Sequence, residues 1–375
     1  MSSSESQTNS IISHEKEEAA AFRSVSASTL PRILRVAVEL DLFEIISKNS
    51  HSNTPDDDHG YLSASEIASH LPIKSPGKAP ATLERLLRCL ASFDFLKCKQ
   101  SAAGGEGGGK RWLYGLAPLA SKYFVCDQNG GSLAPMLLFV EDKVFAEAWY
   151  HMKDAILDGG LPFNKAHGMS VFEYPKKEPR FGEVFNKAMH SYTILAMKDI
   201  LDKYKGFAGL KQIVDVGGGL GATLGSIVSK YPHIEGINYD LPQVVKTAPT
   251  WPGVQHVGGD MFESVPKGEV IFMKWILHDW SDEMCLKLLK NCWKALPESG
   301  KVIIVESILP ENPQDNDPIS RNGFHYDMIM WALTVEGQER TEKEFDALAK
   351  AAGFAASKPI CRAANIWVIE FYKTI

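Results

Sequence analysis

The second half of the chain alternates between short β-branched runs and longer stretches with a helical period. Runs rich in Val and Ile predict strands, because these side chains favour a buried, pleated surface. We expect strands near residues 212–216, 235–240, 254–258, 269–274 and 301–307, an antiparallel pair near 358–362 and 365–372, and helices near 220–230, 281–296 and 341–353. Strands that alternate with helices are typical of the α/β class, so we predict a doubly wound sheet.

The first half of the chain has mainly helical periodicity. We expect a helix or a pair of helices over 24–47, a short helix after residue 63, a helix over 81–93, and extended segments over 95–99 and 112–116. Ser63 and Glu66 have the spacing of a capping box, which would open the short helix. Two helices followed by a hairpin form a winged-helix pattern, which is usually associated with DNA binding. The acidic surroundings favour instead a scaffold that packs against another chain.

Large apolar side chains are frequent between about residues 134 and 200, where the pattern is helical. Most of them should be core, and a few could line a pocket for a flat aromatic ligand. The first 20 residues carry too little apolar surface to offset the entropy of ordering. We therefore expect a disordered tail over 1–20, an N-terminal domain over 21–175 and a cofactor-binding domain over 176–375.

Composition narrows the classes of partner and compartment. The 375 residues carry a formal net charge of −6, which argues against nucleic acid, because phosphate binding requires a basic surface. No apolar run is long enough to cross a membrane, and the polar N-terminus does not resemble a secretory signal. The six cysteines lack metal-ligand spacing and are most simply the reduced thiols of a cytoplasmic protein.

The segment 213–221 reads as a strand that ends in glycines and continues into a helix, a typical cradle for a nucleotide-like ligand. Gly217, Gly219 and Ala222 also satisfy G-x-G-x-x-A, so the segment taken alone fits a dinucleotide. A dinucleotide pyrophosphate would face Asp215 and Asp260 with no obvious arginine nearby. A cationic cofactor such as S-adenosylmethionine fits this acidic corner better, and Asp240 would bind ribose hydroxyls in either case.

One histidine stands where a reacting group is expected. His278 follows the fourth predicted strand, at the carboxyl end where ligands of α/β sheets bind. Glu306 and Glu339 could hydrogen-bond its second nitrogen and hold one tautomer, as a general base requires. The alternative for each glutamate is a solvated surface charge, which is unfavourable for Glu306 because it lies within an apolar run.

Six motifs together carry a family resemblance. The segments DVGGGLG, NYDLP, GGDMF, FMKWILHDWSDE, GKVIIVESILP and GQERT closely resemble the plant small-molecule O-methyltransferases of the caffeic acid and flavonoid type, over about residues 20–375. The resemblance implies a Rossmann-like methyltransferase domain, a winged-helix-like N-terminal dimerisation domain, a homodimer and no catalytic metal. It places S-adenosylmethionine against Gly217, Asp240, Leu241, Asp260, Met261 and Lys274, with His278 as general base flanked by Glu306 and Glu339.

The same resemblance implies the residues around the acceptor. These are Phe145, Phe181, Phe185, Met189, Trp275, Asp279, Tyr326, Ile329 and Met330. The chain departs from the caffeate type at Val140 and Thr334, where that type carries asparagine, and at Trp331, where it carries leucine. Fewer amide donors and more aromatic surface favour a larger or less polar acceptor than caffeic acid, such as a lignan, monolignol, coumarin or flavonoid.

Chemistry favours a phenolic acceptor. Proton transfer from a phenol of pKa about 10 to a histidine of pKa about 6.5 is uphill by about 5 kcal/mol, and an aliphatic alcohol would cost more. Methylation of caffeate or 5-hydroxyferulate at the 3-oxygen is the alternative within the same class. Outside the class, an NAD-dependent oxidoreductase and a non-catalytic binding module are the competing hypotheses.

Overall fold

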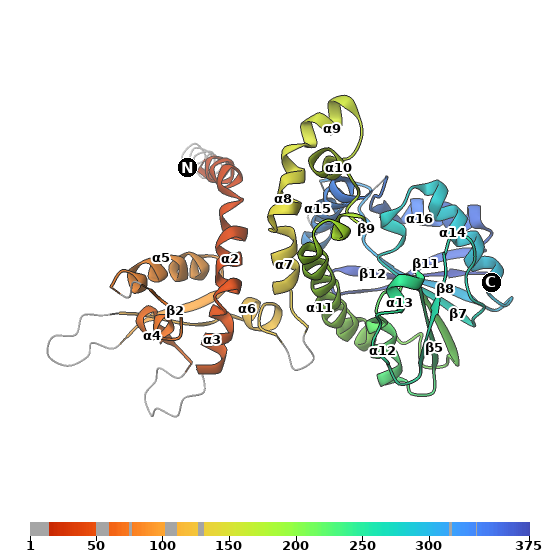
Figure 1. Ribbon diagram of the computed structural model, residues 1–375, viewed down its shortest axis with the longest axis horizontal. Helices are drawn as coiled ribbons and strands as arrows, with labels where there is room; N and C mark the ends of the chain where they lie inside the picture. Colours follow the sequence, from red (N-terminus) through yellow and green to blue (C-terminus); the bar gives the residue numbers. More distant parts are fainter. Residues whose placement is uncertain are drawn as a thin grey trace, which may run out of the picture. The chain divides into compact units, whose positions relative to one another are not determined.

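A computed structural model describes residues 15–49, 60–74, 77–101, 111–126, 131–314, 317–334 and 336–375. The chain divides into two compact units, which Figure 1 shows and which are described separately here. The first unit comprises Met1–Asp127 and Ser132–Glu141, and the second comprises Gln128–Gly131 and Asp142–Ile375. Among the described residues, no helix is long and apolar enough to cross a membrane.

The first unit has the predicted helix and hairpin pattern. Its elements are α2 (Thr29–Glu39), α3 (Leu42–Asn49), β1 (Leu62–Ser63), α4 (Ala64–Ser69), α5 (Ala79–Ser92), β2 (Leu96–Gln100), β3 (Trp112–Leu116), α6 (Pro118–Tyr123) and α7 (Ala134–Val140). The strands form an antiparallel sheet in the order β1-β3-β2. The predicted pair of helices is confirmed, because Asp41 adopts a φ of 51° and separates α2 from α3. The capping box of Ser63 and Glu66 is also confirmed.

The N-terminal tail differs in part from the prediction. Residues 1–14 lie outside the described part of the chain, so disorder there stays a prediction. Residues 15–26 are helical and exposed, so the expectation of disorder is wrong for residues 15–20. Consecutive alanines and glutamates make this stretch a good helix former even though it offers few large apolar side chains.

The second unit begins with helices that precede its sheet. These are α8 (Lys143–Tyr150), α9 (Met152–Asp158), α10 (Pro162–His167), the short η1 (Tyr174–Lys176) and the long α11 (Pro179–Lys203). Helices α8 and α10 pack against each other and against α15 (Pro318–Leu333). Phe163 of α10 also stacks on Phe181 of α11, with ring centroids 6.2 Å apart. Residues 142–175, which we expected in the N-terminal domain, therefore lie in the second unit, because their apolar faces are buried there.

Seven strands form the sheet of the second unit, in the order β11-β12-β8-β7-β4-β5-β6. They are β4 (Gln212–Val216), β5 (Glu235–Asp240), β6 (Val254–Gly258), β7 (Val270–Lys274), β8 (Lys301–Glu306), β11 (Ala356–Ala363) and β12 (Ile366–Tyr372). Strands β4 to β8 are parallel, whereas β12 runs antiparallel to β8 and β11 to β12. Every predicted strand of this half is confirmed. The short parallel pair of β9 (Ile308–Leu309) and β10 (Arg340–Thr341) was not predicted.

Helices cover both faces of this sheet, as doubly wound folds require (Figure 1). One buried layer contains Leu289 of α14 (Asp282–Ala295) and Phe345 of α16 (Glu342–Ala352). The opposite layer contains Ile200 of α11 and Ile227 of α12 (Ala222–Lys230). The chain order reverses at β4, which lies between β5 and β7. Such a reversal opens a crevice at the carboxyl ends of the strands, where ligands bind.

Candidate active site

The glycine segment after β4 is a turn that requires glycine at several positions. Gly217, Gly219 and Gly221 have φ values of 71°, 57° and 83°, in the left-handed region that other residues rarely adopt. A Cβ on Gly217 would lie 2.3 Å from the Ile276 side chain. The Gly217 amide donates to the Tyr239 carbonyl at 2.8 Å, which ties the turn to β5. The cradle expected from the sequence is therefore present at the crevice.

Two side chains from the end of β5 hold the central peptide groups of this turn. Asp240 accepts hydrogen bonds from the amides of Gly219, at 2.8 Å, and Leu241, at 2.7 Å. The Asn238 amide donates to the Gly219 carbonyl at 2.9 Å. Asn238 was missed in the sequence, because its complete burial, which makes a partner for its amide necessary, is visible only in the structure.

The crevice is acidic, as expected. Asp215 of β4 is buried, and burial raises its pKa, with Lys274 opposing the shift. Burial lowers the pKa of Lys274, and its ammonium donates to the Thr193 hydroxyl at 3.1 Å. Burial also raises the pKa of Asp240, although the hydrogen bonds from the backbone oppose this shift. A cation would be electrostatically favoured at this site.

The turn after β6 closes the same edge of the sheet. Gly259 donates its amide to the Asp240 carbonyl at 3.0 Å, which brings Asp260 and Met261 to the end of β5. Asp260 accepts from the Phe262 amide at 2.8 Å, and Leu241 is 44% exposed. The structure thus gathers five of the expected cofactor residues, and Lys274 ends the neighbouring β7.

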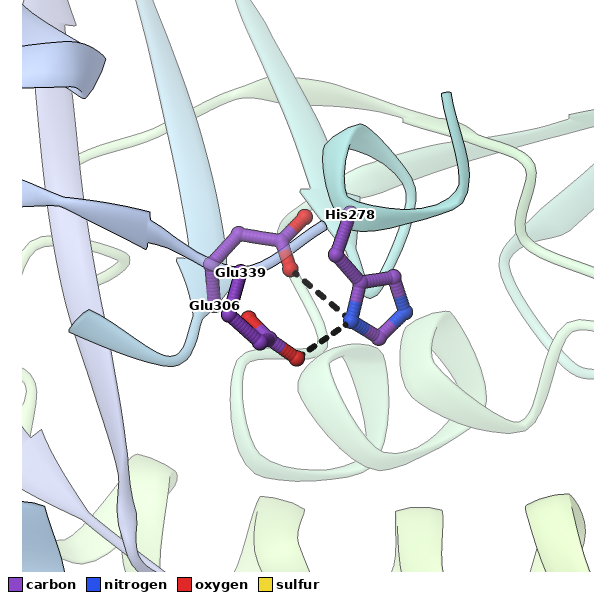
Figure 2. Close-up of side chains that lie close together, drawn as sticks. All are labelled: His278, Glu306 and Glu339. Atoms are coloured by element: carbon purple, nitrogen blue, oxygen red, sulfur yellow. Dashed lines mark hydrogen bonds and ion pairs between the residues drawn. The ribbon is translucent and has the colours of Figure 1, made fainter. Parts of the chain in front are cut away.

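The expected histidine and glutamates come together although they are far apart in sequence (Figure 2). His278 lies in η2 (Leu277–Asp279), just after β7, Glu306 ends β8, and Glu339 precedes β10. The imidazole Nδ1 lies 2.9 Å from Glu339 Oε1 and 3.7 Å from Glu306 Oε2. Its Nε2 is on the other side of the ring, 3.7 Å from Asp279 Oδ1. The two glutamates therefore fix Nδ1, while Nε2 points away from them.

Both glutamates are buried, which rules out the surface-charge alternative. Glu306 is fully buried and Glu339 is 4% exposed. Glu306 Oε1 accepts from the amides of Ile276, at 3.0 Å, and Leu277, at 2.9 Å, so this carboxylate also holds the backbone before His278. One ligand atom from each of the three residues lies within 4.8 Å of the others, so this donor set could also hold a metal ion.

The carboxylates decide the protonation of the imidazole. Burial by itself lowers the pKa of His278, but the charges of Glu306 and Glu339 and the hydrogen bond to Glu339 raise it to about 10. Burial raises the pKa of Glu306 to about 7, with His278 opposing, and burial raises the pKa of Asp279 to about 6. An imidazolium is therefore strongly stabilised here, and a proton on Nδ1 faces Glu339.

Most expected acceptor residues lie on two helices near this histidine. Phe181, Phe185 and Met189 are spaced by four residues along α11 and share one of its faces. Tyr192 continues that face and stacks on Trp275, with ring centroids 4.5 Å apart. Tyr192 was missed, although it lies three residues after Met189 and therefore on the same helical face.

Three further expected acceptor residues lie on α15, and one lies on α8. Tyr326, Ile329 and Met330 lie on α15, and the Tyr326 hydroxyl is hydrogen-bonded to Tyr192. Phe145 of α8 is fully buried and packs on Trp149, with ring centroids 5.5 Å apart.

Thr334 ends α15 without an exposed polar group. Its side chain is buried, and its hydroxyl donates to the Met330 carbonyl at 2.8 Å. The hydroxyl is thereby used inside the helix end, since a single O–H group can donate only one hydrogen bond. Val140 belongs to the first unit, and Trp331 is half-buried on α15.

A doubly wound sheet with a glycine turn and acidic residues after two strands is typical of enzymes that bind a nucleoside-containing cofactor. Residues 149–355 match the O-methyltransferase domain family, and residues 22–125 match the O-methyltransferase dimerisation domain. The chain belongs to this O-methyltransferase family and is an S-adenosylmethionine-dependent O-methyltransferase, similar to the plant enzymes of the caffeic acid and flavonoid type. The resemblance, the fold class and the enzyme class expected from the sequence are confirmed.

Individual relatives are similar over nearly the whole chain. An esculetin O-methyltransferase of Kitagawia praeruptora is 54% identical, covering 96% of this chain and 97% of its own. A caffeic acid 3-O-methyltransferase of Catharanthus roseus is 52% identical over 100% of both chains. The structure of human N-acetylserotonin methyltransferase in complex with SAM has a TM-score of 0.77, with 22% identity over 96% of this chain and 98% of that one. That likeness shows the shared fold.

The glycine turn leads to a first prediction. A Cβ on Gly218 would lie 2.1 Å from Asn238 Oδ1 and 2.7 Å from Asp215 Oδ2, so Gly218→Ala must displace the turn. We expect calorimetry to show at least an about tenfold weaker affinity for S-adenosylhomocysteine, equal to about 1.4 kcal/mol. Gly209→Ala is the control, because a Cβ there has no atom within 4 Å. Equal affinity in both variants would contradict the assignment of the turn as the cradle.

Proposed function

We propose that this enzyme transfers the methyl group of S-adenosylmethionine to a phenolic hydroxyl, with His278 as the general base. The observation that carries the proposal is the contact of His278 Nδ1 with Glu339 at 2.9 Å, which leaves Nε2 as the nitrogen that would meet the acceptor. The glycine turn is the proposed site for the adenosyl group, with Gly217, Asp240, Leu241, Asp260, Met261 and Lys274 around the cofactor.

Proton transfer is better matched than an ordinary histidine would allow. A phenol has a pKa of about 10, and Glu306 and Glu339, although opposed by burial, shift the pKa of His278 upward from its ordinary value of about 6.5 and so towards that of the phenol. The proton moves from the phenol to Nε2, while Glu339 stabilises the resulting imidazolium through Nδ1. Bound S-adenosylmethionine would supply the methyl group, which the phenolate oxygen would take while the electron pair of the carbon–sulfur bond stayed on sulfur.

His278 must be neutral before it accepts the proton. The high pKa of His278 applies to the protein without cofactor, where no sulfonium lies beside the imidazole. The positive sulfonium of the bound cofactor would disfavour protonation of a nearby imidazole. Cofactor binding would therefore prepare the base, and the acidic surroundings would favour the cationic substrate over its neutral product.

A phenylpropanoid-derived phenol is the proposed acceptor class. The relatives named above are called esculetin and caffeic acid O-methyltransferases, and both of those acceptors are small phenols. The Thr334 hydroxyl donates its one proton to the Met330 carbonyl, so it offers no donor to a ring hydroxyl, whereas an asparagine amide would. We therefore favour a coumarin, lignan, monolignol or flavonoid derivative, with caffeate or 5-hydroxyferulate 3-O-methylation as the alternative.

The assembly and environment are proposed on the same grounds. The match of residues 22–125 to a dimerisation domain supports a homodimer. The free cysteines, two of them exposed, are consistent with a reducing cytoplasmic location. The net charge of −6 disfavours a nucleic-acid partner.

We expect His278→Ala to lower kcat by about 100- to 10,000-fold and to leave a small residual rate, because the acceptor then loses its base. The affinity for S-adenosylhomocysteine should change little, because the glycine turn is intact. Turnover is measured with labelled S-adenosylmethionine, and affinity by calorimetry. His233→Ala, an exposed histidine bonded to the Ala208 carbonyl, is the matched control and should keep full activity. Full turnover in the His278 variant would remove the proposed base.

Methyl transfer should need no metal ion, although His278, Glu306 and Glu339 form a possible donor set. The hydrogen bond between Nδ1 and Glu339 already uses the nitrogen that a metal ion would need. We expect dialysis against EDTA to leave kcat unchanged and metal analysis of the active protein to find less than stoichiometric metal. Loss of activity that a divalent ion restores would contradict this expectation.

The acceptor hypothesis can be tested with a panel of phenols. We expect a coumarin, lignan, monolignol or flavonoid to show a higher kcat/KM than caffeate or 5-hydroxyferulate. Thr334→Asn should narrow that difference, because it restores an amide donor at the end of α15. Mapping the methylated oxygen identifies the site of transfer. The hypothesis is wrong if caffeate or 5-hydroxyferulate is the most efficient acceptor of the panel.

A further inference from the structure

Arg340 is one of the largest fully buried side chains in the described part of the chain, at 1% exposed. It opens β10, directly after Glu339. A buried guanidinium is costly unless its donors are paired, so the fold must gain something specific from this residue. Neither the proposed chemistry nor the cofactor site uses it.

The guanidinium binds the backbone on both sides of the proposed base. Nη1 donates to the Leu277 carbonyl at 2.8 Å and Nη2 donates to the Trp280 carbonyl at 2.8 Å. Its Nε donates to Asp282 Oδ1 at 2.9 Å, at the start of α14. The planar fork of arginine therefore spans the turn that contains His278.

The hydrogen bonds between backbone groups within this turn are long. Its backbone bonds are those from the Asp279 amide to the Ile276 carbonyl, at 3.3 Å, and from the Trp280 amide to the Leu277 carbonyl, at 3.4 Å. Both are longer than the usual 2.9–3.0 Å. The Cys285 thiol also donates to the Leu277 carbonyl at 3.1 Å, but a thiol is a weak donor. The two short bonds from Arg340 are therefore the stronger restraint on the carbonyls of this turn.

Glu339 and Arg340 contact different parts of the His278 turn. Neighbouring residues of an extended segment point to opposite sides, so one side chain reaches the imidazole and the other reaches the backbone. Glu339 sets the orientation of the ring through Nδ1, and Arg340 sets the position of the turn that carries it.

We propose that Arg340 is a positioning residue for methyl transfer, which holds the His278 turn so that Nε2 meets the acceptor hydroxyl. This inference rests on the proposed role of His278 as base. Displacement of a reacting group by about 1 Å can cost about 100-fold in rate. A residue that only stabilised the fold would alter the unfolding transition without a selective effect on kcat.

The test compares Arg340→Met, which removes the donors, with Arg340→Lys, which keeps the charge but cannot span three acceptors. We expect kcat to fall about 100-fold in the methionine variant and about tenfold or more in the lysine variant. The affinity for S-adenosylhomocysteine, measured by calorimetry, should stay within about twofold, because the cofactor cradle is separate. Calorimetric binding also verifies that each variant is folded, and the lysine variant decides the outcome if the methionine variant does not fold.

Lys301→Met is the matched control for losing a buried cation. Lys301 starts β8, at the opposite end of the strand from Glu306, and its ammonium lies 2.6 Å from the buried Glu370 carboxylate. Removal of the lysine leaves the buried Glu370 carboxylate without its cation, which destabilises the fold. We expect a lower melting temperature with kcat unchanged at a temperature where the protein is folded.

A double-mutant cycle with His278→Ala separates this inference from the proposed function. If Arg340 acts through His278, then Arg340→Met should cause no further loss of kcat in the His278→Ala background. Independent, multiplying losses would overturn the positioning role. Wild-type kcat in both Arg340 variants would also overturn it, while leaving the role of His278 intact. Wild-type turnover in His278→Ala would instead refute the proposed base.

Discussion

The constraint on which this site depends is the burial of an imidazole between two carboxylates. A pair of buried glutamates is unfavourable unless a cation or a proton donor lies between them. His278 meets that need through Nδ1, and its preference for the protonated state follows directly. The same geometry that stabilises an imidazolium gives the ring a single orientation. A strong base and a fixed direction are thus two consequences of one electrostatic arrangement.

The sheet supplies this arrangement at its carboxyl edge. Strands β7 and β8 are adjacent and parallel, so the residues that follow them lie side by side. Glu306 ends one strand and His278 follows the other, while the small β9 and β10 pair brings Glu339 and Arg340 against them. The glycine turn lies at the same edge, after β4. The proposed cofactor cradle and the proposed base therefore share one rigid framework, which suits an in-line transfer that tolerates little displacement.

The residues of the proposed acceptor site differ in chemistry from the charged residues around the proposed base. Its residues come from α11, α15 and the turn after β7, and they are aromatic or apolar with few polar tips. The Tyr192 and Trp275 rings stack, and Thr334 uses its hydroxyl within its own helix end. A surface of this kind selects by shape and apolar area more than by hydrogen bonds. Closely related enzymes can share the base and cofactor residues and still differ in acceptor.

Much of this protein could be predicted from local patterns. The β-branched runs predict the strands of the large sheet. The positions of the glycines, Asp240 and His278 at strand ends indicate that they belong to a ligand site. The assignment of 142–175 to the N-terminal domain did not match the compact units, because periodicity shows that a face is apolar without showing what covers it. For the same reason, the sequence did not identify Asn238 and Tyr192 as site residues, because their partners lie far along the chain.

The sequence by itself determined the order of strands and helices, the glycine turn and the residue types available for chemistry, since these depend on neighbours along the chain. Only the tertiary structure decided that Nδ1 of His278 contacts Glu339 while Nε2 lies on the other side of the ring. It also decided that two carboxylates raise the pKa of the imidazole and that Arg340 donates hydrogen bonds to the carbonyls of the His278 turn. These features depend on charges brought together from distant segments and removed from water. Their energies exist only once the sheet has formed.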